Sequence, residues 1–116
     1  MKKKLLSLAL ALTMVLAMAI PVFAGSYSSD GYYEGSYYEI AETCSRNSFS
    51  CSTICMDYST ITYVKAYDSE GNYDDAQGSA CIGMSTASDS VPFEISRIHT
   101  THYVNNNSVR TNTITP

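Results

Sequence analysis

The segment STITYVKAY, residues 59–67, constrains the fold of this chain more than any other. The segment alternates between two sets of residues, Ile61, Tyr63, Lys65 and Tyr67 in one and Thr60, Thr62, Val64 and Ala66 in the other. Nearly every one of these side chains is β-branched or aromatic. Alternation with a period of two is typical of a β-strand, whose successive side chains point to opposite faces. The following segment DSEGNYDD, residues 68–75, is polar and contains a glycine, which is typical of a hairpin turn. The two segments predict antiparallel β structure.

Strand-like patterns recur further along the chain, at AQGSACIGMSTAS (76–88), VPFEISRIHTTHYV (91–104) and SVRTNTIT (108–115). The three asparagines at 105–107 predict a turn before the last of these segments. In the second of these, Ile98 has the opposite parity to Phe93, which predicts a β-bulge near residues 96–97. After residue 24 no convincing helical periodicity of apolar residues occurs. We therefore expect an all-β fold, a small antiparallel β-sandwich of the immunoglobulin-like kind with about six to seven short strands.

The first 24 residues have the layout of a secretory signal peptide. Three lysines at positions 2–4 precede an apolar block at residues 5–20, and Val-Phe-Ala at 22–24 is a small-x-small cleavage site. We expect cleavage after Ala24 and a secreted, extracellular protein with no stable membrane insertion after cleavage. The alternative is an uncleaved N-terminal anchor, although the block is short for a membrane span.

Cleavage would divide the chain into a signal peptide (1–24), a lead-in (25–35) and a single β-sandwich domain (36–116). The lead-in is rich in Gly, Ser and Tyr, a composition typical of a flexible segment. Its Tyr-Tyr-Glu triplet at 32–34 is repeated at 37–39. Tandem tyrosines offer rigid aromatic contact area, so a possible binding surface consists of Tyr32, Tyr33, Tyr37 and Tyr38. The alternative is that Tyr37 begins the first strand and the earlier tyrosines are simply solvated.

All four cysteines follow the signal peptide, and an even number of cysteines in a small exported domain predicts disulfides. We expect two staples among Cys44, Cys51, Cys55 and Cys81. In an extended segment Cys51 and Cys55 would be about 13 Å apart, beyond the reach of one disulfide. A turn at residues 47–48 would place Cys44 opposite Cys51 and leave Cys55 for Cys81. The other open connectivity is Cys44–Cys55 with Cys51–Cys81.

A metal site is the competing interpretation of the same cysteines. Cys51 and Cys55 could join His99 and His102, but the His spacing lies outside the range of zinc fingers. A strand would also send the two histidines to opposite faces, so we expect both to be structural. The acidic segment at 68–75 departs from the calcium-loop pattern of EF-hands and is better explained as a turn. We expect neither a metal nor another cofactor.

Charge and motif content restrict the function. Residues 25–116 carry four basic and eleven acidic side chains, a net charge of −7, which disfavours nucleic acid and anionic membranes as partners. No G-x-S-x-G motif or Gly-rich phosphate loop occurs, and no carboxylates are marked as a facing pair. We therefore expect that the protein is not an enzyme.

The stretch ISRIHTTHYVNNNSV, residues 95–109, carries a resemblance. With the signal peptide and the Ser/Thr/Tyr-rich β pattern, it is similar to small secreted β-sandwich proteins of Gram-positive bacteria. Over residues 60–116 it resembles the lactococcin-like bacteriocins of the β-sandwich kind. The resemblance implies a bacteriocin-like sandwich and an antibacterial protein that acts on the cell-wall synthesis of competitors, but it identifies no functional residue.

The composition favours an interaction protein. Ten tyrosines and a large share of Ser, Thr and Asn cannot all enter the core of so small a domain. We expect a secreted, non-catalytic protein that presents this polar and aromatic surface to a cell-wall polymer, a glycan or an extracellular protein. The alternative is the antibacterial protein that the resemblance implies.

Overall fold

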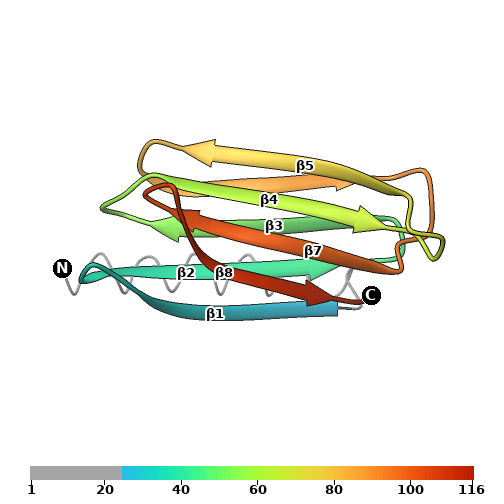
Figure 1. The fold of residues 1–116 in the computed structure, drawn as a ribbon, viewed down its shortest axis with the longest axis horizontal. Coiled ribbons are helices and arrows are strands. Elements are labelled where there is room, and N and C mark those ends of the chain that lie inside the picture. Colours follow the sequence, from blue (N-terminus) through green and yellow to red (C-terminus); the bar gives the residue numbers. More distant parts are fainter. Residues whose placement is uncertain (1–24) are drawn as a thin grey trace.

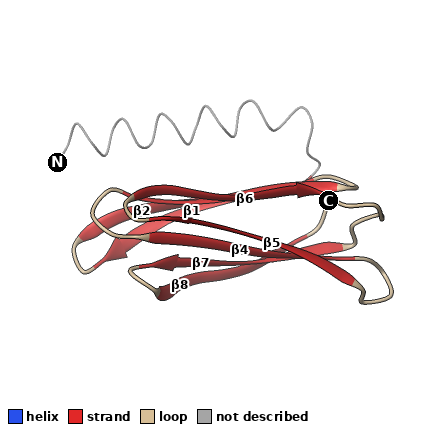
Figure 2. Ribbon diagram, turned by 90° about the horizontal axis from the view of Figure 1, so that it is seen from above, coloured by secondary structure: helices blue, strands red, loops and turns tan. Residues whose placement is uncertain are grey.

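The computed structural model describes residues 25–116, and the predicted signal peptide lies outside the described residues. These residues form two four-stranded antiparallel sheets that stack as a sandwich (Figures 1 and 2). The first sheet has the order β1-β2-β3-β6 and the second β5-β4-β7-β8. The strands are β1 (Gly25–Tyr33), β2 (Ser36–Cys44), β3 (Ser48–Cys55), β4 (Thr60–Tyr67), β5 (Tyr73–Ala80), β6 (Gly83–Ser90), β7 (Arg97–Val104) and β8 (Asn107–Ile114). The all-β fold is confirmed, with eight strands where we predicted six to seven. No helix within residues 25–116 is long and apolar enough to cross a bilayer.

The segment 76–88, predicted as a single strand, contains the end of β5, a turn at residues 81–82 and the start of β6. A further strand is β1, which occupies most of the segment predicted as a flexible lead-in. It pairs along its whole length with β2, from Gly25 opposite Cys44 to Tyr33 opposite Ser36. The connecting residues Glu34 and Gly35 have φ angles of 47° and 82°, the positive values of a tight hairpin turn. The sequence pattern did not reveal β1, because its alternating positions hold Gly and Ser as well as tyrosines.

The predicted strand at 59–67 is β4, and its alternating residues point to opposite faces of the sheet, as expected. Its inner face is fully buried, whereas the outer face is half-exposed. The last strand is also confirmed as β8, which follows a turn in which Asn105 and Asn106 have φ angles of 52° and 62°. Asparagine tolerates this left-handed backbone better than most residues, so the sequence indicated the turn correctly.

The segment before β7 differs from the prediction. Residues 91–96 form a loop rather than a strand, and the irregular register lies between His102 and Tyr103 instead of near 96–97. The loop carries the chain from β6 in the first sheet to β7 in the second. Val91 N–H donates to the Asn47 carbonyl, so this crossing is fixed against the β2–β3 turn. The apolar side chains there close one end of the core instead of marking a strand.

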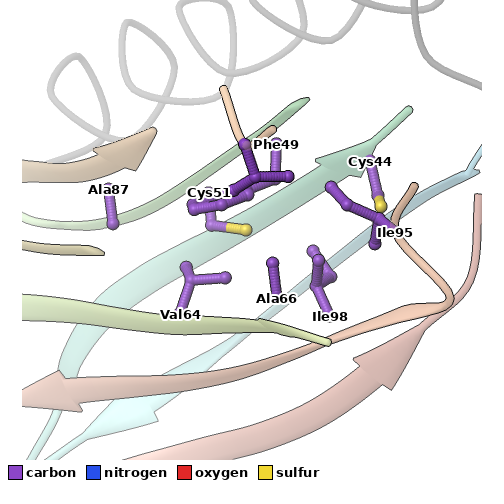
Figure 3. Packing of buried hydrophobic residues seen from close by; sticks show 9 residues of the cluster. Cys44, Phe49, Cys51, Val64, Ala66, Ala87, Ile95 and Ile98 are labelled. Carbon is purple, nitrogen blue, oxygen red and sulfur yellow. The ribbon is translucent and has the colours of Figure 1, made fainter. Parts of the chain in front are cut away.

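The main apolar core lies between the sheets (Figure 3). Phe49 and Ala87 reach inward from the first sheet, and Val64 and Ile98 from the second. A second cluster along the strands contains Tyr38, Ile40, Cys55 and Val104. Both clusters come from residues 25–116, so this part of the chain has its own core between the sheets.

A polar layer separates these two apolar clusters. Glu42 of β2 and His102 of β7 are both completely buried, and their Oε2 and Nε2 atoms are 2.7 Å apart across the two sheets. His102 Nδ1 lies 2.7 Å from Thr53 Oγ1, which in turn lies 2.7 Å from Thr62 Oγ1. Asn112 Nδ2 donates to the other oxygen of Glu42 at 3.1 Å. Hydrogen bonds therefore satisfy the buried ionisable pair and tie five strands together.

The predicted disulfide staples are not supported, because all four cysteines are free thiols. The turn between β2 and β3 comes earlier than the expected residues 47–48, so Phe49 lies opposite Cys44, and Cys51 lies opposite Glu42. Cys55 lies between Tyr38 and Gly83 on the neighbouring strands. A shift of register changes which residues lie opposite each other, so the cysteines are not brought together in either of the two predicted pairings.

Candidate binding surface

The four tyrosines predicted as a binding surface do not form one. Tyr38 is only 7% exposed and belongs to the core, whereas Tyr32 is 69% exposed. Tyr33 points inward and packs edge-on against Tyr58, with ring centroids 5.3 Å apart. Consecutive residues of a strand point to opposite faces, so each Tyr-Tyr pair is divided between the core and the surface.

The two outward tyrosines of this set lie on the outer face of the first sheet. Tyr32 and Tyr37 meet in an edge-on contact with ring centroids 5.5 Å apart. The Tyr37 hydroxyl is 2.7 Å from Glu39 Oε1 and 2.8 Å from Asp30 Oδ2. Desolvation, reinforced by these two carboxylates, raises the pKa of Tyr37 far above its usual value. Tyr37 is therefore engaged with its own neighbours, and only Tyr32 is strongly exposed.

A larger aromatic surface lies on the outer face of the second sheet. Figures 1 and 2 show that no other described element covers this face. Register pairs bring its members together: Tyr67 lies between Tyr73 on β5 and Arg97 on β7, and Ile61 lies beside Tyr103. We call this surface the tyrosine face and define it by Tyr63, Lys65, Tyr67, Tyr73, Arg97 and Tyr103.

Rings and cations on the tyrosine face contact one another. The Arg97 guanidinium carbon is 4.2 Å from the centroid of the Tyr67 ring. Lys65 Nζ is 4.7 Å from the Tyr73 centroid and 6.0 Å from the Tyr63 centroid. The Tyr67 and Tyr73 rings are 5.6 Å apart and tilted by 47°. Cation–π contacts at exposed sites contribute about 0.5–1 kcal/mol each, so together they order the side chains of this layer.

Polar groups are also fixed on this face. The Tyr63 hydroxyl donates to Asp75 Oδ2 at 2.8 Å, and this bond, with desolvation, raises the pKa of Tyr63 to about 12. The same bond fixes the orientation of the Tyr63 hydroxyl. His99 Nδ1 lies 2.8 Å from Thr113 Oγ1 of the neighbouring strand. The surface thus combines rigid rings with positioned hydrogen-bonding groups.

Only part of this surface was predictable from the sequence. It predicted the strand with Tyr63, Lys65 and Tyr67 on one side, but alternation alone does not say which side faces solvent. The strand order, in which β5 and β7 flank β4, adds Tyr73 and Arg97. These two residues are six and thirty positions away from Tyr67 along the chain, so no local pattern connects them.

The histidines lie on opposite faces of β7, as predicted. His102 is in the buried polar layer, and His99 is on the half-exposed outer side. Residues 25–116 contain no group of three or more His, Cys, Asp or Glu side chains placed to hold a metal ion.

The segment at 68–75 contains the β4–β5 turn. The backbone N–H groups of Glu70 and Asn72 donate to Asp68 Oδ1, each at 2.9 Å. The side chain of Asn72 donates to the other oxygen and is the largest cause that lowers the pKa of Asp68. Asp68 therefore stabilises the turn by accepting hydrogen bonds.

The buried Glu42–His102 pair has the chemical groups of an acid–base site, but it is sealed between the sheets. Both residues have no exposed surface, and His102 contacts Thr53 rather than an open cleft. A substrate has no route to these atoms in this conformation. The pair therefore acts as a structural link between the sheets.

One depression lies at the end of the sandwich where the β2–β3 turn meets the loop before β7. Its volume is about 490 Å³, and it is lined by Arg46, Asn47 and residues 91–94. Arg46 and Glu94 form an ion pair at 3.5 Å at its rim, with both side chains largely exposed. This depression has one aromatic ring, Phe93, and lacks the ordered layer of the tyrosine face.

No protein-family model, curated protein or solved structure matches this chain.

Proposed function

We propose that this protein is a secreted, non-catalytic binding protein that attaches to a glycan of a cell wall or another extracellular surface through the tyrosine face. The observation that carries the proposal is the connected layer of rings and cations on an uncovered sheet face, with Tyr67 in contact with Tyr73 and Arg97. Tyrosine offers a ring surface for the apolar side of a sugar and a hydroxyl for its polar edge.

The shape of the face favours an extended polymer. Tyr63 and Tyr67 are four residues apart on one strand, which corresponds to about 13 Å. A flat row of this length suits successive sugars of a chain better than a single small molecule, which usually binds in a concave site. The hydrogen-bonded groups beside the rings, Asp75 and His99, lie where sugar hydroxyls would meet them.

The sealed polar layer supports the non-catalytic part of the proposal. Glu42 and His102 are a completely buried acid and base, and their side chains contact each other, Thr53 and Asn112. The half-exposed histidine, His99, contacts the hydroxyl of Thr113, and no carboxylate of the described residues hydrogen-bonds to its ring to complete a triad.

The proposal is tested by sedimentation of the purified chain, residues 25–116, with isolated cell walls and insoluble polysaccharides. We expect binding, and we expect the triple variant Tyr63→Ser, Tyr67→Ser and Tyr73→Ser to bind at least about tenfold more weakly, the equivalent of about 1.4 kcal/mol. The matched control is Tyr32→Ser, which removes a strongly exposed tyrosine from the other sheet.

Three results would contradict the proposal. The unmodified chain could bind no wall or glycan fraction, the triple variant could bind as well as the unmodified chain, or the Tyr32→Ser control could lose binding to the same extent. Growth inhibition of neighbouring bacteria without wall binding would favour the antibacterial alternative implied by the resemblance at residues 95–109.

A further inference from the structure

The few cations of residues 25–116 are distributed unevenly. Two of the four have partners away from the tyrosine face: Arg46 forms an ion pair with Glu94 at 3.5 Å, and Arg110 donates to Ser29 at 3.1 Å where β8 approaches β1. The other two, Lys65 and Arg97, are both on the tyrosine face. One face of one sheet therefore holds half of the Lys and Arg side chains of residues 25–116.

These two cations contact rings instead of carboxylates. Neither Lys65 nor Arg97 forms an ion pair with any acidic residue of the described part, although this part contains eleven acids. Asp75 lies directly opposite Lys65 in the sheet register, yet its carboxylate accepts a hydrogen bond from the hydroxyl of Tyr63. The rings thus hold both cations in position, and neither cation has an ion-pair partner among the described residues.

The tyrosine face has a different charge balance from the rest of the molecule. At the outward positions of the second sheet, Lys65 and Arg97 are positive and Asp75 is the one acid, whereas residues 25–116 together carry a net charge of −7. The acids Asp68 and Asp74 lie next to this face on the β4–β5 hairpin, at one end of it. A ligand that lies along β4 and β7 therefore meets two cations that have no ion-pair partner among the described residues.

We propose that the glycan bound by this face is anionic. Its carboxylate, phosphate or sulfate groups contact Lys65 and Arg97, while adjacent sugars stack on Tyr63, Tyr67 and Tyr73. The planar guanidinium of Arg97 can donate two parallel hydrogen bonds to such a group, and Lys65 supplies a second charge one strand away. This inference rests on the proposed function and specifies its ligand class.

The test compares polymers that share a backbone and differ in charge. Affinities of the purified chain would be measured for polygalacturonate and its methyl ester, dextran sulfate and dextran, and phosphomannan and neutral mannan. We expect at least one charged polymer to bind about tenfold or more tightly than its neutral partner, with affinity that falls as salt rises. The charged polymer with the largest ratio identifies the anionic group.

Variants separate this inference from the proposed function. The double variant Lys65→Gln with Arg97→Gln should lower the affinity for the charged polymer to the affinity for its neutral partner. The variant Arg46→Gln, which removes an exposed cation elsewhere, should leave the ratio of the two affinities unchanged. Thermal unfolding of each variant checks that the sheet is intact.

Separate outcomes contradict the anionic ligand and the proposed function. If the chain binds charged and neutral polymers equally well, and the tyrosine triple variant loses this binding, the anionic ligand is contradicted and the proposed function stands. The anionic ligand is also contradicted if Arg46→Gln abolishes the preference for the charged polymer, or if the chain binds none of the six polymers. If the chain also fails to bind cell walls, both the anionic ligand and the proposed function are contradicted.

Discussion

At the scale of single residues, burial rather than oxidation determines the chemistry of the cysteines. Cys51 is almost completely buried, and desolvation raises the pKa of its thiol to about 12. Burial also raises the pKa of the Cys44 thiol to about 11. A thiol reacts as its thiolate, so these two side chains are protected both by the absence of thiolate and by the sheets around them. Cys81, in contrast, is exposed.

We predict that one cysteine reacts with iodoacetamide at pH 8 in the folded protein, and that it is Cys81. After unfolding in urea without reductant, all four should react, because unfolding removes the burial that raises the thiol pKa values. Mass spectrometry of the intact protein counts the added groups, and a Cys81→Ser variant should show none in the folded state. If no thiol reacts after unfolding without reductant, the cysteines are paired and the free-thiol structure is contradicted.

The Glu42–His102 pair allows a second prediction at this scale. The variant Glu42→Ala removes the acceptor of both His102 and Asn112 inside the core. We expect the free energy of unfolding to fall by about 3–5 kcal/mol, the usual cost of leaving one member of a buried pair without its partner. Urea unfolding measures the loss.

The control for this prediction removes both partners. The double variant Glu42→Leu with His102→Phe replaces the pair by apolar side chains and should cost less than Glu42→Ala alone. A loss below about 1 kcal/mol for Glu42→Ala would contradict the account, since that is the value expected for an exposed ion pair.

At the scale of strands, the sequence predicted elements where the alternation involves large residues. The strands β4 and β8 and the Asn105–Asn106 turn were predicted because β-branched side chains and a characteristic turn are visible locally. The strand β1 was missed, because its inward positions include Ser29 and Gly31 as well as tyrosines. The cysteine pairing was wrong for a different reason: it depended on the register of β2 against β3, which the length of one turn decides.

The approach of β5 to β6 at one side of the sandwich requires a glycine. A side chain at Gly78 would meet the backbone carbonyl of Thr86, which belongs to the other sheet. We predict that Gly78→Ala pushes the two strands apart and lowers the free energy of unfolding by about 1–3 kcal/mol. Ser79→Ala, at the neighbouring exposed position, should change it by less than about 0.5 kcal/mol. Equal stability of the Gly78→Ala variant in urea unfolding would show that the strands are not in close contact.

At the scale of the whole molecule, the sandwich converts scattered residues into one surface. Composition alone indicated that polar and aromatic side chains must remain outside the core, and this reasoning led to an interaction protein. It placed the surface at Tyr32, Tyr33, Tyr37 and Tyr38, because these residues are adjacent in sequence. Adjacent residues of a strand diverge, whereas residues on neighbouring strands converge, so the larger surface consists of side chains from β4, β5 and β7.

Amide chemical-shift mapping shows, residue by residue, whether ligands bind to the outer face of the second sheet. A ¹⁵N-labelled sample of residues 25–116 would be titrated with soluble cell-wall fragments while the backbone amide signals are followed. We predict that the shifted signals cluster at residues 61–67, 73–79 and 97–103, and that signals of the first sheet remain in place. Shifts concentrated around Tyr32 and Tyr37 or around the Arg46 turn, or no shifts at saturating fragment, would contradict the claim.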